Sequence, residues 1–173
     1  LPSNIFALVA GGLTSAVLVP QIVKAAKNAD GGQAFVNKLL TLGITVCLGV
    51  AVLLTALVPV IVPLYVESNM ALSEAGVNLA IAFAFWCMPQ VFFYAVYALV
   101  GEALNARQVF GPYTWAPVVN NLVLVATYLT FGFVFGFDPA HQQPDSWSAE
   151  QIALLAGGAT LGIAVQCLVL TLF

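Results

Sequence analysis

The sequence predicts an all-α protein built as a bundle of helices that span a membrane. Of its 173 residues, 62% are hydrophobic and 6% are charged, whereas about a quarter of the residues in a soluble domain are charged. The charged residues leave five charge-free windows, at 1–23, 39–66, 75–101, 108–137 and 151–173. Each window is long enough to cross a bilayer, which takes about 20 apolar residues. A water-soluble fold is therefore excluded.

Five transmembrane helices are expected from these windows. In hydrocarbon every backbone N–H and C=O must be satisfied within the protein, and the windows are too long and too uniform for the strands of a barrel. The expected helices lie at about 4–28, 35–65, 76–106, 112–137 and 148–173. A turn at 28–33 contains Gly31 and Gly32, which are free to take positive φ. Pro59 and Pro63 each remove an N–H donor and should bend the second helix.

The later helices carry start signals and a breaker. Pro89 is a helix-breaking residue inside the third helix, and Pro112 suits the first turn of the fourth, where Pro117 is tolerable one turn later. Ser148-Ala-Glu-Gln151 resembles a capping box at the start of the fifth helix. Trp147 beside it is expected to anchor that end at the membrane interface.

The charges between the helices predict an orientation. The four basic residues all fall in the first and third connections, while the acids of the second and fourth connections have no basic partner there. Since Lys and Arg near helix ends favour the cytoplasmic side, the chain should start outside, cross five times and end in the cytoplasm. The basic residues are Lys24, Lys27, Lys38 and Arg107, and the opposing acids are Glu67, Glu74, Asp138, Asp145 and Glu150. The chain starts without Met and stops inside an apolar run, so it is expected to be part of a longer membrane protein.

The sequence holds no catalytic constellation. His141 is the sole histidine and no pair of acids falls within a span, so neither an enzyme, a metal site nor a cofactor is expected. No basic stripe exists, which argues against nucleic acid as a partner. Cys47, Cys87 and Cys167 lie in different apolar windows and are interpreted as small buried residues.

Small and polar residues within the spans are the candidate functional residues. Gly158, Gly162 and Gln166 share one helical face, and Gly11 with Ser15 and Gly12 with Ala16 form similar pairs; both tight internal packing and a sliding surface fit this pattern. Polar side chains in spans need a partner or a wet cavity, so each indicates either an interhelical hydrogen bond or a partly wet interior. These side chains belong to Asn4, Gln21, Asn37, Asn78, Gln90, Asn120, Asn121 and Gln166.

Two separated motifs carry a resemblance to a known family. The first comprises Leu99-Val-Gly-Glu-Ala-Leu-Asn105, Phe110, Pro112 and Ala116-Pro-Val-Val-Asn-Asn121, and the second Leu1-Pro, Ala10, Gly12, Ser15 and Leu18-Val-Pro20; Pro89 also matches. In this pattern the chain resembles the MurJ/MviN family of lipid II flippases, within the multidrug/oligosaccharidyl-lipid/polysaccharide exporter superfamily. The chain departs from the family pattern in two places. Pro112 lies one position earlier than the family proline often does. Phe6 and Ala7 stand where many relatives have a basic pair, and Gly11 where they have an acid.

The resemblance implies a fold and a function. Residues 1–173 would form a single transmembrane domain, most of the N-terminal lobe of a two-lobed transporter with about fourteen helices. The whole protein would move lipid II, a lipid-linked peptidoglycan precursor, from the cytoplasmic to the outer leaflet of the bacterial plasma membrane by alternating access. Partners would be lipid II and membrane lipids, with proteins of cell-wall synthesis or division as further candidates.

The resemblance and the polar pattern together give a set of candidate site residues. Asn105 and Arg107 are assigned to a cytoplasmic hairpin. The candidates for lining the substrate cavity or contacting the other lobe are Asn4, Gly11, Gly12, Ser15, Gln90, Asn121, Gly158, Gly162 and Gln166.

Two other readings remain open. A related exporter, either a polysaccharide-lipid flippase or a drug/cation antiporter, shares the superfamily, although an antiporter is expected to bury an acid, and Glu67, Glu74 and Glu102 lie at window edges. A membrane scaffold or interaction protein needs no wet interior. In a scaffold the buried amides of Gln90, Asn120, Asn121 and Gln166 should all be satisfied by protein partners.

Overall fold

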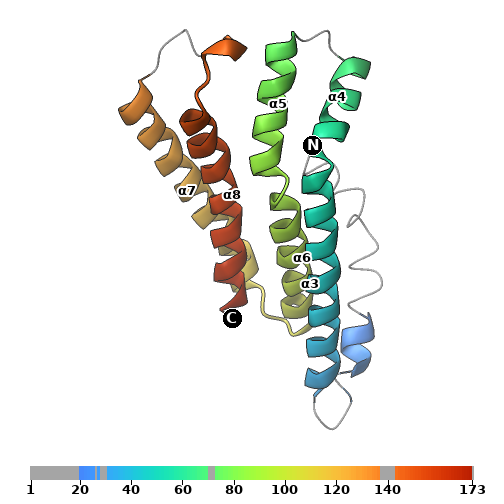
Figure 1. Cartoon of the computed structure of the whole chain (residues 1–173). Coiled ribbons are helices and arrows are strands. Elements are labelled where there is room, and N and C mark those ends of the chain that lie inside the picture. The colour runs from blue at the N-terminus through green and yellow to red at the C-terminus, as the bar shows by residue number, and fades with distance from the viewer. Residues whose placement is uncertain (1–19, 26, 28–30, 70–72, 137–142, 173) are drawn as a thin grey trace.

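The computed structural model of the chain describes residues 20–25, 27, 31–69, 73–136 and 143–172. Within these ranges a short helix at 20–25 is followed by six longer helices and one short 3-10 turn, with no strand (Figure 1). The elements are α3 (Gln33–Ala56), α4 (Val58–Asn69), α5 (Glu74–Cys87), α6 (Gln90–Ala106), α7 (Gly111–Phe135), η2 (Pro144–Ser146) and α8 (Ala149–Thr171).

Four segments of the described chain are long and apolar enough to span a membrane, namely 33–56, 74–106, 111–135 and 149–171. They confirm the expected helices at 76–106, 112–137 and 148–173, and of the helix expected at 35–65 they cover the part up to Ala56. Of the expected helix at 4–28, residues 20–25 are helical and residues 1–19, 26 and 28 lie outside the described residues. Large apolar side chains such as Leu42, Phe133 and Leu172 are highly exposed. This outward-facing apolar surface suits a lipid environment.

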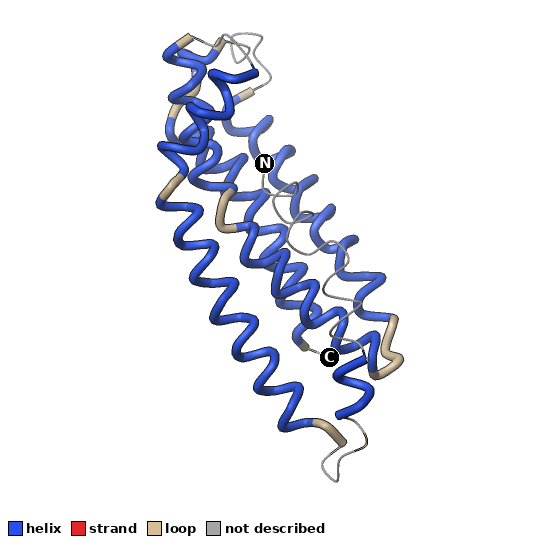
Figure 2. Tube along the Cα trace, turned by 90° about the vertical axis from the view of Figure 1, so that its right-hand side faces the viewer, coloured by secondary structure: helices blue, strands red, loops and turns tan. Residues whose placement is uncertain are grey.

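Two of the expected helices are interrupted, which corrects their expected ranges. The helix at 35–65 is divided after Ala56, because Pro59 lacks the N–H that would bond to the Thr55 carbonyl. The helix at 76–106 is divided at Met88 and Pro89, where Val91 and Phe92 instead donate to the carbonyls of Met88 and Pro89 at 3.1 Å. In Figure 2, where loops are tan, two interruptions lie at a similar height along the bundle.

Turn and cap residues define the helix ends much as the sequence predicts. Gly31 and Gly32 take φ of 62° and 80° before α3. The capping box of α8 is present: the Gln151 N–H donates to Ser148 Oγ at 3.2 Å, and the Ser148 N–H donates to Gln151 Oε1 at 2.8 Å. Ser73 caps α5 through a bond from the Gly76 N–H. These caps satisfy N–H groups that lack a partner in the first turn of a helix.

Helix α8 occupies the middle of the described bundle and packs against α5, α6 and α7, while α3 packs on α6 and α4 on α5 (Figure 1). Ile22, Val36 and Ala103 form one buried cluster, which brings the start of α3 next to the end of α6. Lys38 and Arg107 therefore lie towards one end of the bundle. The opposite end holds the starts of α5 and α8 with η2, and these carry Glu74, Asp145 and Glu150.

Candidate functional site

A polar contact crosses the middle of the bundle at the break between α5 and α6. Gln90 begins α6 beside Pro89 and is 7% exposed, and its Nε2 donates to Thr160 Oγ1 of α8 at 3.0 Å. Thr160 Oγ1 in turn lies 2.7 Å from the Trp86 carbonyl near the end of α5. Because a carbonyl next to a helix break lacks a regular helical donor, a hydroxyl from α8 takes that place.

The Thr160 hydroxyl has two alternative acceptors. Its Oγ1 is 2.7 Å from the Trp86 carbonyl and 3.0 Å from the Ala156 carbonyl of its own helix. A hydroxyl carries a single hydrogen and can donate to one of them at a time. Thr160 can therefore bond to α5 or turn back onto α8 without leaving its hydrogen unpaired.

Helices α7 and α8 meet through the two glycines predicted from the sequence. Gly158 faces Thr127 of α7, and a Cβ at that position would overlap the Thr127 side chain. Gly162 faces the Asn120 side chain in the same way. These close contacts need the absence of a Cβ, which is the usual basis of small-residue packing between helices in lipid.

At Pro117 a hydroxyl from another helix supplies the donor that the proline lacks. Pro117 inside α7 has no N–H for the Tyr113 carbonyl one turn earlier, and Tyr97 Oη of α6 donates to that carbonyl at 2.8 Å. The rings of Tyr97 and Tyr113 stack with centroids 5.1 Å apart, and the side chain of Gln166 lies near the Tyr97 hydroxyl. Tyr113 lies against Gly101, the glycine of the Leu99–Asn105 motif. Part of that motif therefore packs α6 against α7.

The adjacent asparagines of α7 lie in different surroundings. Asn120 Oδ1 is buried against Gly162 and has no hydrogen-bond partner among the described residues. Asn121, the next residue, is exposed although it lies well inside a membrane-spanning segment. It shares its exposed helical face with Val125 and Tyr128, which follow at helical spacing. An amide in this position must meet water or another polar group, because hydrocarbon offers it no hydrogen bond.

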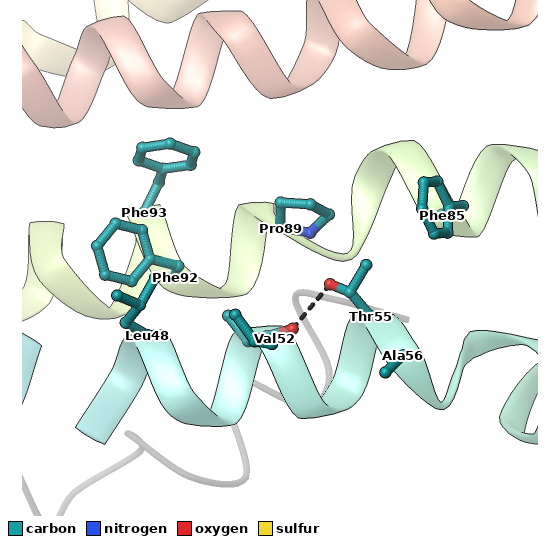
Figure 3. A pocket seen from close by; sticks show the side chains of 9 residues that line it. Leu48, Val52, Thr55, Ala56, Phe85, Pro89, Phe92 and Phe93 are labelled. Atoms are coloured by element: carbon teal, nitrogen blue, oxygen red, sulfur yellow. Dashed lines mark hydrogen bonds between the residues drawn. The ribbon is translucent and has the colours of Figure 1, made fainter. Parts of the chain in front are cut away.

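A groove of about 550 Å³ lies between α3 and the α5–α6 break (Figure 3). Its walls are apolar: Phe92 and Phe93 from α6, Phe85 from α5, and Leu48 and Val52 from α3. The one hydroxyl, of Thr55, donates to a carbonyl of its own helix at 2.7 Å. None of the predicted polar residues lines this groove, so it suits hydrocarbon and not a charged headgroup.

The predicted hairpin lies between α6 and α7. Asn105 is half-buried near the end of α6, and its carbonyl accepts the Gln108 N–H at 3.0 Å. Gln108 adopts a φ of 62° and turns the chain, while Arg107 before it is exposed. The hairpin thus presents a cation at the end of the bundle that also holds Lys38.

The predicted site residues fall into three groups. Gln90, Gly158, Gly162 and Gln166 contact neighbouring helices, whereas Asn121, Asn105 and Arg107 are at least partly open; Asn4, Gly11, Gly12 and Ser15 lie outside the described residues. Sequence reasoning missed Thr160, Tyr97 and Thr127. For Tyr97 the signal was available in part, since Pro117 identifies the carbonyl that needs a donor but not the helix that supplies it. No proline identifies Thr127, or the Trp86 carbonyl that Thr160 contacts.

The described residues bring no set of three His, Cys, Asp or Glu side chains together, and Cys47, Cys87 and Cys167 are free thiols. The arrangement offers amide, hydroxyl and carbonyl groups within membrane-spanning helices.

Comparison with known proteins gives the family. A family model described as Lipid II flippase MurJ matches residues 1–173, the whole chain. The search of solved structures found no match. The match of the complete chain agrees with the motifs at 99–121, and the protein belongs to the MurJ lipid II flippase family.

Proposed function

We propose that this chain forms most of the N-terminal lobe of a transporter that carries lipid II from the cytoplasmic to the outer leaflet by alternating access. The family supports a lipid II flippase in general. The headgroup of lipid II carries a pyrophosphate and sugars, and moving even one charge to the centre of a bilayer is costly. The protein must therefore supply a polar path while the lipid tail stays in hydrocarbon.

The observation that carries this proposal is the exposed amide of Asn121 within α7. Gln90 bonds to Thr160, and the buried side chain of Gln166 lies near the Tyr97 hydroxyl, as they would in a scaffold as well. Asn121 is exposed, and a scaffold packed only against lipid would not be expected to place an amide there. In a transporter the same amide can face a wet cavity or the other lobe, where it can donate to and accept from a sugar or phosphate.

The charge distribution supports the orientation. Lys38 and Arg107 lie at one end of the bundle and Glu74, Asp145 and Glu150 at the other. The basic end would face the cytoplasm and the acidic end the outside of the bacterial plasma membrane. Arg107 in the hairpin would then lie at the leaflet on which the substrate is made, where it can attract anionic headgroups.

Complementation tests the proposal. The full-length parent of this chain is expressed in a bacterium depleted of its own lipid II flippase, and growth is measured together with the amount of lipid II in the outer leaflet. We expect rescue by the unmodified protein. Rescue should fall when Asn105 and Arg107 are changed together to Ala, and also in Asn121→Leu. Val125→Leu, one turn further along the same exposed face of α7, is the matched control and should keep rescue.

The outcomes separate the readings. If a stable, inserted parent protein fails to rescue, the substrate is a different lipid-linked sugar and a related exporter is favoured. If the parent rescues but Asn121→Leu and Val125→Leu behave alike, the exposed amide is not part of the polar path. Protein amounts in the membrane are measured for each variant, because loss of rescue is meaningful only at equal abundance.

A further inference from the structure

The two interrupted helices share one joint. Val58, the first residue of α4, and Met88, at the α5–α6 break, are both 0% exposed and belong to the same buried cluster. Val62 and Val91 complete that cluster. The breaks therefore lie at one level of the bundle and pack against each other. Figure 2 shows two tan interruptions at a similar height.

The halves on either side of the joint form separate pairs. Towards the acidic end α4 packs on α5, and towards the basic end α3 packs on α6. The two helices of each pair pack against each other. Between the pairs, helical structure is interrupted in both connections, at Leu57 and at Met88–Pro89. Breaks of this kind are where packed helical units change their relative angle, because a few residues at element ends absorb the change.

Helix α8 runs without interruption past the joint and is bonded to both sides of it. Thr160 accepts from Gln90, which begins α6, and donates to the carbonyl of Trp86, which belongs to α5. A single hydroxyl thus holds the end of one half and the start of the next at a fixed distance from α8.

We propose that α4 and α5 move as one body about the joint formed by Val58 and Met88, and that Thr160 holds this joint in the arrangement seen here. When Thr160 lets go of the Trp86 carbonyl, its hydroxyl does not lose a partner, because it can turn to the Ala156 carbonyl at 3.0 Å. The Trp86 carbonyl can then recover the N–H of Gln90 as the break straightens, since these two groups are four residues apart.

The groove beside the joint leaves room for such a movement. It opens between α3 and the α5–α6 break and is lined by Phe85, Pro89 and Val52, so its apolar wall suits lipid hydrocarbon (Figure 3). A change in angle between α5 and α3 would alter the width of this groove without breaking a polar contact there. Thr55, the one hydroxyl in its wall, bonds only within α3.

Distances between spin labels test the proposal on the full-length protein in lipid nanodiscs. The native cysteines are replaced and labels are placed at exposed positions, one pair joining Leu64 of α4 to Leu168 of α8 and the other joining Leu42 of α3 to Leu168. Thr160→Val removes the hydroxyl at nearly constant shape and should shift or broaden the Leu64–Leu168 distribution alone. Thr160→Ser should restore it.

Two further variants make the result decisive. Thr130→Val in α7 removes a hydroxyl that bonds within its own helix and should change neither distribution. Pro89→Ala restores an N–H for the Phe85 carbonyl and should narrow the Leu64–Leu168 distribution. The proposal is overturned if Thr160→Val and Pro89→Ala both leave that distribution unchanged, or if both label pairs shift together. The measurement needs no substrate, so its failure is independent of the transport assay.

Discussion

The two sides of the described bundle are built on different principles. Helices α7 and α8 run unbroken for 25 and 23 residues and touch through glycines that admit no Cβ. On the other side α3 to α6 form two interrupted helices that meet at Val58 and Met88. Glycine contacts bring two backbones close together, whereas breaks allow helical segments to change their angle.

This difference predicts which side of the bundle tolerates an added methyl group. Where a glycine faces backbone or a fixed polar side chain, an added methyl group forces the helices apart. Where a glycine faces the tip of a flexible side chain, the neighbour can move. The first situation occurs between α7 and α8 and the second between α3 and α6. Replacing a glycine with alanine should therefore lower stability more on the first side than on the second.

The largest effect is expected for Gly162→Ala in α8. An added Cβ would overlap Asn120 Oδ1 and lie 3.3 Å from the Asn120 backbone oxygen, which cannot move without α7. Overpacking of this kind costs about 1–3 kcal/mol. The apparent melting temperature of the full-length protein in detergent should fall. Gly49→Ala in α3 is the control because its Cβ would meet nothing within 4 Å, and an equal fall in Gly49→Ala would contradict the glycine contact.

A smaller and reversible effect is expected for Gly158→Ala. Its Cβ would overlap the side chain of Thr127, which bonds only to the Val123 carbonyl of its own helix at 2.9 Å. Truncation of the neighbour in Thr127→Ala should therefore recover part of the lost stability. Contacting residues usually couple by about 0.5–3 kcal/mol. A double-mutant cycle on melting temperature measures this, and strictly additive effects would show that the two residues do not touch.

The smallest effect is expected for Gly43→Ala on the interrupted side. Its Cβ would come within 2.7 Å of Leu99 Cδ1, the end of a side chain that can rotate away. The gain in helix propensity on replacing Gly with Ala, about 1 kcal/mol in water, works in the opposite direction. Melting temperature should therefore change little. A fall as large as that of Gly162→Ala would mean that α3 and α6 are as tightly fixed as α7 and α8.

The hairpin motif shows how far sequence reasoning reached. Its position between two helices, the place of Pro112 in the first turn of α7 and the glycine turn before α3 all followed from local residue chemistry. The role of Gly101 did not, because Tyr113 lies against it only after α6 and α7 have folded back on each other. The prolines at 59 and 89 indicated where the helices break, but the sequence did not indicate that the two breaks lie at the same height of the bundle.

The candidate residues divide in the same way. Gly158, Gly162 and Gln166 were recognised as one helical face from their spacing, and the structure shows which neighbours that face meets. Asn121 and Asn120 looked equivalent in the sequence, yet one is exposed and the other has its Oδ1 buried against Gly162. A single helical step of about 100° decides between the two environments once α8 is in place.

Local sequence features were sufficient to predict that this chain spans a membrane as helices and approximately where each helix lies. The length of an uncharged apolar segment decides whether it inserts into hydrocarbon. Prolines, glycines and capping residues set the helix ends through contacts with residues only a few positions away. Packing between helices was needed to establish that Thr160 bonds to Trp86, that Tyr97 bonds to the carbonyl freed by Pro117, and that Val58 meets Met88. These contacts depend on the relative height and rotation of helices far apart in the chain, which no local pattern encodes.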